Sequence, residues 1–371
     1  MKLFRCAHCA NLVYFENHQC VRCGHALAYV PPLRLVTSLD GDGDERTSPS
    51  APGRRFRLCA NYATHQTCNW VVPADSDDPL CESCELTRVI PDLSLPEWHA
   101  AWYRLEVAKR RLVYELMSLG LPVAPKSAEN PEGLAFEFLA APADPTAPPV
   151  LTGHADGVIT IALAEADDAE RERRRLQMRE PLRTLLGHFR HEIGHYYWDR
   201  LIRDGGKVDA FRAVFGDESD DYAAALQRHY DQGAPAGWPG EFISAYASVH
   251  PWEDWAETFA HYLHMVDALE TAEASGVRID SPVAAGEAPD DFGAMLQAWH
   301  GLTHVLNNLN RSLGLNDAYP FVLPVAALTK MRFVHEVVRT GAEPRHSNAS
   351  TSGLTPHPSA SDARETIINE G

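Results

Sequence analysis

Apolar residues recur with helical spacing in three long segments of the chain. In residues 96–119 they fall every three or four positions, which gathers them on one face of a helix. Residues 252–266 repeat this pattern with large aromatic side chains. Residues 185–198 carry apolar side chains on most sides, so this segment is expected to be a largely buried helix.

Shorter segments predict strands and surface structure. Residues 134–139 and 157–163 are short apolar runs, and the second is rich in β-branched residues, which favour strands. Residues 165–179 are heavily charged and predict a surface helix or loop. The segment 341–371 is expected to be a disordered tail, because its polar composition offers little apolar surface to bury.

The predicted buried helix contains the pattern His191-Glu192-Ile193-Gly194-His195. Residues four apart on a helix lie on one face, so His191 and His195 can bind one zinc ion. Glu192 lies about 100° round the helix, where it can reach a metal-bound water without being a ligand. The pattern also arises by chance with solvated histidines, but a buried helix would not carry these polar side chains without partners. The segment therefore predicts a metal site of the hydrolytic metalloprotease type.

A catalytic zinc ion usually has three protein ligands. In one class of proteases a further histidine follows six residues after His195, but that position is Leu201, which excludes this class. The aromatic helix of residues 252–266 places Glu253 and Glu257 together on the face opposite its apolar side. Spacing alone leaves open which of the two carboxylates binds the metal.

All eight cysteines lie in the first quarter of the chain. Two Cys-x-x-Cys pairs separated by ten residues predict a zinc ribbon, whose members are Cys6, Cys9, Cys20 and Cys23. A second, less regular four-cysteine site is predicted from Cys59, Cys68, Cys81 and Cys84. Such closed sites hold structural rather than catalytic zinc.

The cysteines have an alternative interpretation as four disulfides of a secreted protein. The first residues lack the apolar run and the small-residue cleavage site of a signal peptide. We therefore expect a cytoplasmic protein in which the paired cysteines bind metal.

Charge and composition argue against nucleic-acid and membrane partners and indicate where one domain of the chain ends and the next begins. The formal net charge of −18 argues against a chain-wide nucleic-acid binder. No run of 18 or more apolar residues is present, so no membrane span is expected. A stretch rich in Asp, Gly, Ser and Pro is typical of a linker. The predicted order is a zinc ribbon (1–36), this linker (37–56), a second zinc module (57–95), a catalytic domain (96–340) and the tail (341–371).

The motifs as a set resemble a known family. They are Phe4–Cys9, Cys20–Gly24, Leu58–Tyr62, Cys68–Trp70, Pro79–Cys84, Thr152–Gly157, His188–His195 and His250–Glu257. From residue 1 to residue 340 the chain is similar to bacterial zinc-binding metallopeptidases with an N-terminal zinc ribbon. The resemblance implies an α+β, zincin-like domain preceded by two small zinc-ribbon-type modules, with one catalytic and two structural zinc ions.

Within this group the chain resembles the glutamate-zincins, whose second helix reads roughly Glu-x-x-Ala-Asp/Glu. The match here begins at Glu253 and ends at Glu257. The resemblance implies that Glu253 is the third zinc ligand and that Glu257 orients one of the ligand histidines. The reverse assignment, with Glu257 as the ligand, stays open. In zincins a strand placed like 157–163 edges the active-site cleft and pairs with an extended peptide, whereas the alternative is an ordinary core strand.

The expected reaction is hydrolysis of a protein or peptide substrate. Zinc would activate a water molecule, and Glu192 would take its proton and pass it to the leaving amine. Tyr246, His250 and His188 are candidates for stabilising the oxyanion, although each would also suit a packing or supporting role.

Two other functions stay open. A regulatory or adaptor protein would bind a partner protein through the zinc modules without turnover, but the intact Glu192 speaks against it. A nucleic-acid-associated protease would dock through its ribbons, since the first module is mildly basic and holds Phe4, Tyr14 and Phe15. Such aromatic residues more often pack around a small zinc core than stack on bases.

Overall fold

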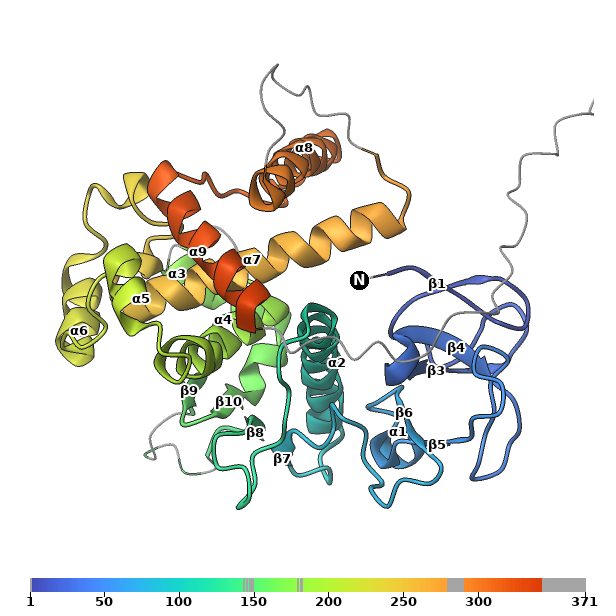
Figure 1. Cartoon of the computed structure of the whole chain (residues 1–371). Helices are drawn as coiled ribbons and strands as arrows, with labels where there is room; N and C mark the ends of the chain where they lie inside the picture. Colours follow the sequence, from blue (N-terminus) through green and yellow to red (C-terminus); the bar gives the residue numbers. More distant parts are fainter. Residues whose placement is uncertain are drawn as a thin grey trace, which may run out of the picture.

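The computed structural model describes residues 2–142, 144, 146, 150–178, 180, 183–278 and 290–341. Its N-terminal part contains three two-stranded antiparallel sheets and a short helix, and the remainder combines one four-stranded sheet with long helices (Figure 1). This arrangement confirms the predicted α+β class. None of the described helices is both long and apolar enough to cross a membrane. The predicted tail lies outside the described residues from position 342 onward.

The N-terminal part is built from short strands that bring the cysteines together. Its elements are β1 (Phe4–Arg5), β2 (Leu12–Val13), β3 (Ala26–Val30), β4 (Leu35–Leu39), β5 (Phe56–Leu58), α1 (Ala60–His65) and β6 (Val71–Pro73). The pairs are β1 with β2, β3 with β4, and β5 with β6. Because so few residues form each strand, this part relies on cross-contacts such as the Tyr29–Trp70 ring pair, whose centroids lie 4.5 Å apart.

The segment predicted as a linker, 37–56, folds onto this part instead. It begins inside β4, where Thr37 is wholly buried and its hydroxyl lies 3.0 Å from the hydroxyl of Ser48. Arg46 donates its backbone N–H to the carbonyl of Phe56 at 2.8 Å. Small hydroxyl side chains suggest a linker by composition, but here they hydrogen-bond to one another and can therefore be buried.

Helix α2 (Pro96–Leu119) lies between the N-terminal part and the helical part of the molecule (Figure 1). Its bounds are those predicted from periodicity, with proline at its first position and Gly120 in the left-handed conformation at its end. Tyr114 packs edge-on against Phe15 of the N-terminal part, with ring centroids 5.3 Å apart. On its other side, Glu115 accepts a hydrogen bond from Arg190 at 3.0 Å.

The four-stranded sheet has the order β7-β8-β10-β9. Its strands are β7 (Thr87–Val89), β8 (Ala135–Leu139), β9 (Gly153–Ala155) and β10 (Val158–Ala162). β10 runs parallel to β8 and antiparallel to β9, so it is paired on both sides. The interpretation of 157–163 as an edge strand is therefore wrong, because a tight turn at Asp156-Gly157, both with positive φ, adds β9 outside it.

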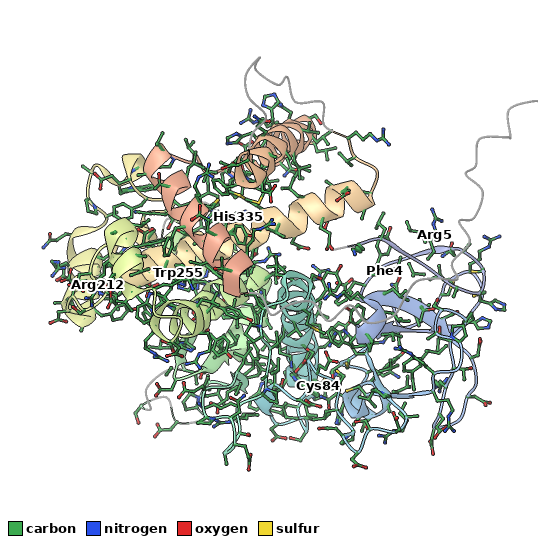
Figure 2. The ribbon with its side chains drawn as sticks, in the orientation of Figure 1. Phe4, Arg5, Cys84, Arg212, Trp255 and His335 are labelled. Carbon is green, nitrogen blue, oxygen red and sulfur yellow. The ribbon has the colours of Figure 1, made fainter. Side chains whose placement is uncertain are left out.

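The remaining helices surround the sheet and one another. They are α3 (Asp168–Met178), α4 (Leu185–Tyr197), α5 (Val208–Phe215), α6 (Tyr222–Gln232), α7 (Pro251–Ala274), α8 (Asp291–Ser312) and α9 (Val325–Gly341), and α4 continues as a π-helical turn (Trp198–Arg203). Trp255 is buried at the centre of this group (Figure 2), where its ring meets Phe211, Phe215 and Phe333. Within the charged segment predicted at 165–179, residues Asp168–Met178 form α3, but Glu165 before it is wholly buried.

Candidate metal centre

Helices α4 and α7 cross closely at the candidate site. A Cβ atom on Gly194 would lie 3.0 Å from Cα of Ala256, so a larger residue would push the two helices apart by a few tenths of an ångström. Trp255 donates its indole N–H to the carbonyl of Gly194 at 2.8 Å, which fixes the register of the two helices. Thr184 caps the start of α4 by accepting a hydrogen bond from Gly187 N–H. The register brings Glu253, near the start of α7, against the histidines of α4.

The imidazoles of His191 and His195 meet the carboxylate of Glu253. Their ligand atoms all lie within 4.8 Å of one another. Glu253 Oε2 is 3.1 Å from His191 Nε2 and 3.5 Å from His195 Nε2. Glu253 and His195 are almost wholly buried, and Glu192 beside them is 8 % exposed.

The hydrogen bonds around these three residues suit a cation. His191 donates Nδ1–H to Glu257 Oε1 at 2.8 Å, and Ser244 donates its hydroxyl to the other oxygen of Glu257 at 2.6 Å. With its proton on Nδ1, the neutral ring of His191 turns the lone pair of Nε2 toward Glu253 Oε2. Oε2 is buried and receives no hydrogen bond from the described residues. Lone pairs that converge in this way are stabilised by a metal ion, and the N/N/O set suits zinc.

Electrostatics at the site support the same conclusion. Burial alone would lower the pKa of His191, but the carboxylates of Glu253 and Glu257 beside its ring raise it well above its usual value. Burial would raise the pKa of Glu253, but His195 and His191 hold it far below its usual value. A buried group of this kind, two carboxylates facing two imidazoles, favours a positive charge between them, which a proton or a metal ion can supply.

Two tyrosines border the site. Tyr222, the first residue of α6, donates its hydroxyl to Glu253 Oε1 at 2.7 Å. The ring centroid of Tyr246 lies 5.9 Å from that of His191. Burial, and next the negative charge of Glu253, raise the pKa of both tyrosines, so both are hydrogen-bond donors at neutral pH. Tyr222 was missed by sequence reasoning, because no spacing connects it with either metal-site helix.

The three oxyanion candidates lie in different surroundings. His250 caps α7: its Nδ1 accepts from Trp252 N–H, and its Nε2 donates to the carbonyl of Asp220 at 3.1 Å. Both ring nitrogens are thus engaged, so His250 cannot also bind an oxyanion. His188 Nδ1 lies 2.9 Å from Glu165 Oε2. Tyr246 is the candidate whose ring lies beside a metal-site histidine, and its hydroxyl also contacts that of Tyr222.

His154, on the edge strand β9, is a further residue that sequence reasoning did not assign to the site. Its ring lies roughly parallel to that of His195, with centroids 6.3 Å apart, and Trp252 covers His195 at 3.8 Å. Its Nε2 accepts a hydrogen bond from Gly157 N–H at 3.0 Å. Burial, and then the nearby His195, lower the pKa of His154 to about 3, so it stays neutral. It closes one side of the site.

Replacing Tyr222 by Phe tests whether its hydroxyl holds Glu253 in place. Loss of a hydrogen bond to a ligand typically costs about 10–100-fold in metal affinity or activity. We expect the variant to keep the metal of the cysteine clusters. The ion between α4 and α7 should be removed by a competing chelator at a concentration about 10–100-fold lower than wild type requires. Tyr230→Phe is the control, since Tyr230 lies on the same helix and is 62 % exposed. Equal retention of zinc by both variants would contradict the role.

The eight cysteines form two compact clusters. Cys6, Cys9, Cys20 and Cys23 make the first, and Cys59, Cys68, Cys81 and Cys84 make the second. Sγ atoms lie 3.6 to 3.7 Å apart in the pairs Cys6–Cys23, Cys9–Cys20 and Cys68–Cys81. These distances are too long for a disulfide, which needs about 2.05 Å, and they suit the edges of a tetrahedral thiolate site.

Metal content tests the three groups together. We expect three zinc ions per chain in protein purified without chelator, two in the cysteine clusters and one between α4 and α7. Elemental analysis of the wild-type chain measures the total, and Cys81→Ser should lower it by one. A total near one with disulfide-bonded cysteines would contradict the zinc assignment of the clusters.

Comparison with known proteins agrees with this geometry. The model of the family described as "Putative zinc-binding metallo-peptidase" matches residues 98–337, and that of a zinc-ribbon domain matches residues 3–95. Similar curated proteins include one from Mycobacterium bovis and two from strains of Mycobacterium tuberculosis, all three described as uncharacterized. Each is 45% identical over 353 residues, which cover 94% of this chain and 99% of the relative. No solved structure matches the chain.

Proposed function

The chain belongs to the family described as "Putative zinc-binding metallo-peptidase", and from this premise we propose that it hydrolyses peptide bonds at the centre between α4 and α7. His191, His195 and Glu253 would hold the zinc ion. The observation that carries the proposal is the convergence of their three ligand atoms within 4.8 Å, beside a carboxylate, Glu192, that none of them engages. Binding of metal alone would not require that free carboxylate.

The residues around the ion would divide the work as follows. When bound, zinc lowers the pKa of a coordinated water and polarises the carbonyl of the substrate. Glu192 takes the proton of the attacking water and delivers it to the leaving amine. Tyr246 donates its hydroxyl to the oxyanion, because burial and Glu253 keep that hydroxyl protonated. Glu257 and Ser244 hold the ring of His191, and Tyr222 holds Glu253.

Strand β9 is proposed to receive the substrate backbone. It is one of the two edge strands of the sheet, and His154 within it faces His195, which β7 at the other edge does not reach among the described contacts. An extended peptide can add to such an edge through main-chain hydrogen bonds, which gives affinity without sequence preference. The role that the family resemblance implied for 157–163 therefore passes to the neighbouring strand.

The N-terminal zinc part, residues 1–95, is proposed to dock a substrate or a partner protein. Leu12, Tyr14 and Val21 near the first cysteine cluster are exposed, with 92 % of Val21 accessible. A small metal-stabilised part that presents apolar side chains in this way suits protein contact. We also propose residues 96–340 as the catalytic domain and the cytoplasm as its location, because the eight cysteines lie as metal-type clusters without disulfides.

A cleavage assay tests the proposed activity. Zinc-loaded full-length protein is incubated with a mixed peptide library, and mass spectrometry identifies new termini. Cleavage should stop when a chelator removes the ion between α4 and α7 and should return when zinc is restored. A protein that holds three zinc ions and cleaves no peptide would instead support the adaptor function.

A further inference from the structure

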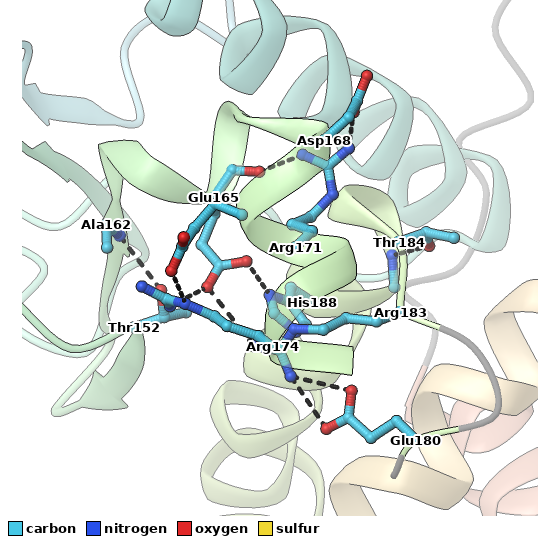
Figure 3. A network of polar contacts seen from close by, with 12 residues as sticks. Thr152, Ala162, Glu165, Asp168, Arg171, Arg174, Glu180, Arg183, Thr184 and His188 are labelled. Carbon is cyan, nitrogen blue, oxygen red and sulfur yellow. Dashed lines mark hydrogen bonds and ion pairs between the residues drawn. The ribbon is translucent and has the colours of Figure 1, made fainter. Parts of the chain in front are cut away.

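A polar cluster lies beside the first turns of α4 and consists of Glu165, Arg174, Arg183 and His188; we call it the Glu165 cluster (Figure 3). The Glu165 carboxylate is wholly buried and accepts from Arg174 Nη1 at 2.6 Å. Arg183 Nη2 lies 3.5 Å from the same oxygen. Burial would raise the pKa of Glu165, but the close contact with His188 and the charges of the nearby arginines lower it to about 2. The cluster therefore holds a buried carboxylate ion at neutral pH.

His188 is the member of this cluster that lies on the metal-site helix. It precedes His191 by three residues and His195 by seven, so the three side chains lie along one stripe of α4. Its Nδ1 is directed to Glu165 Oε2 at 2.9 Å (Figure 3). This contact orients the ring and directs Nε2, on the other side of the ring, away from Glu165. The side chain is 18 % exposed, whereas Glu165 behind it is 1 % exposed.

The direction of β9 decides which part of a substrate would meet His188. Thr152, immediately before β9, accepts a hydrogen bond from Ala162 N–H at 3.2 Å, and Ala162 leads directly into the turn that carries Glu165. His154, further along β9, stacks over His195. The strand therefore runs from the turn of α4 that holds His188 toward the turn that holds His195. A peptide that pairs antiparallel with β9 runs the opposite way, from His195 to His188.

We propose that His188, oriented by Glu165, contacts the side chain of the substrate residue immediately after the cleaved bond and selects a polar side chain there. The proposal rests on the proposed peptidase function. A hydrogen-bonding side chain in this position satisfies His188 Nε2. An apolar side chain would bury that nitrogen without a partner, next to a carboxylate ion and two guanidinium groups. Glu165 is a positioning residue, since it acts through the ring of His188.

Two substitutions of His188 separate its two ring nitrogens. In His188→Asn the amide takes the place of Nδ1 and keeps the contact to Glu165, but nothing reaches the position of Nε2. In His188→Gln the longer side chain places an amide near the position of Nε2. Glu165→Gln keeps the shape of the buried side chain and removes its charge. His300→Asn is the control, because His300 is exposed on α8.

Each variant is loaded with zinc, its metal content is measured, and it is assayed on a peptide library varied at the positions on both sides of the cleaved bond. We expect three zinc ions in every variant. For His188→Asn, KM should rise about tenfold on peptides with a polar residue after the bond, the value for one lost hydrogen bond, with kcat little changed. The preference for a polar residue after the bond should be lost, while the preference for the residue before the bond stays. His188→Gln should restore part of the preference for a polar residue after the bond, and Glu165→Gln should weaken that preference.

The outcomes separate this proposal from the function on which it rests. If the wild-type enzyme cleaves peptides and His188→Asn cleaves them with the same preference for the residue after the bond, the proposed role of His188 is overturned. A change confined to the residue before the bond would overturn the direction assigned to the substrate. A wild-type protein with three zinc ions and no cleavage of any peptide would overturn the peptidase function itself, and the subsite with it.

Discussion

Replacing Glu192 by Gln is expected to abolish peptide hydrolysis while leaving all three metal sites filled. Glu192 lies on α4 between the two histidines and is 8 % exposed, and its negative charge acts on Tyr222, the residue that hydrogen-bonds to Glu253. Glutamine has the same shape but cannot take a proton from water. General-base catalysis contributes about 10²–10⁴-fold in rate, so kcat should fall by at least that factor.

The measurement combines activity with structure. Peptide products are quantified by mass spectrometry for wild type and Glu192→Gln at equal zinc content, and thermal unfolding of the two proteins is compared. Glu336→Gln provides the matched control, because Glu336 is an exposed helical carboxylate on α9. Full activity in Glu192→Gln would remove this residue from the mechanism. Loss of the third zinc ion would show that the substitution disturbs the metal site itself.

Local features of the fold were predictable because they depend on neighbours along the chain. Helix α2 begins at Pro96 and ends at Leu119, the bounds of the segment whose apolar residues have helical spacing. Cysteine pairs and the two histidines of α4 come together through spacings of three and four residues, which one turn of chain sets. The strand β10 likewise follows from its β-branched residues.

Features that depend on distant contacts were missed or misjudged. Tyr222 reaches Glu253 from a helix 31 residues earlier, and nothing in its own neighbourhood marks it. β10 lies inside the sheet because β9 pairs with it, and β9 has only three residues, too few to show the alternation of apolar and polar side chains that marks a strand. His250 was a candidate donor by its type, but capping of α7 engages both of its ring nitrogens. Composition alone suggested a linker where Thr37 and Ser48 are buried.

The largest expected difference in metal content is between Glu253→Ala and Glu257→Ala. Glu253 Oε2 lies within 3.5 Å of both ligand nitrogens, whereas Glu257 meets the two histidines only at His191 Nδ1, on the side of the ring turned away from Glu253. Glu253→Ala should therefore lower the zinc content from three ions to two, with the cysteine clusters still filled. Glu257→Ala should keep three ions at saturating zinc and lose about 10–100-fold in affinity or activity, the usual cost of losing an outer partner.

Zinc titration of both variants against a chelator of known affinity measures this difference directly. Ser244→Ala extends the test, because Ser244 touches the metal site only through the second oxygen of Glu257. If Glu257 acts by orienting His191, Ser244→Ala should weaken zinc binding in the same direction as Glu257→Ala and by a smaller factor. If instead Glu257→Ala loses the ion while Glu253→Ala keeps it, then Glu257 is the ligand. Glu253, held by the hydrogen bond from Tyr222, would then have a supporting role. The family pattern Glu-x-x-Ala-Asp/Glu would in that case not identify the ligand in this chain.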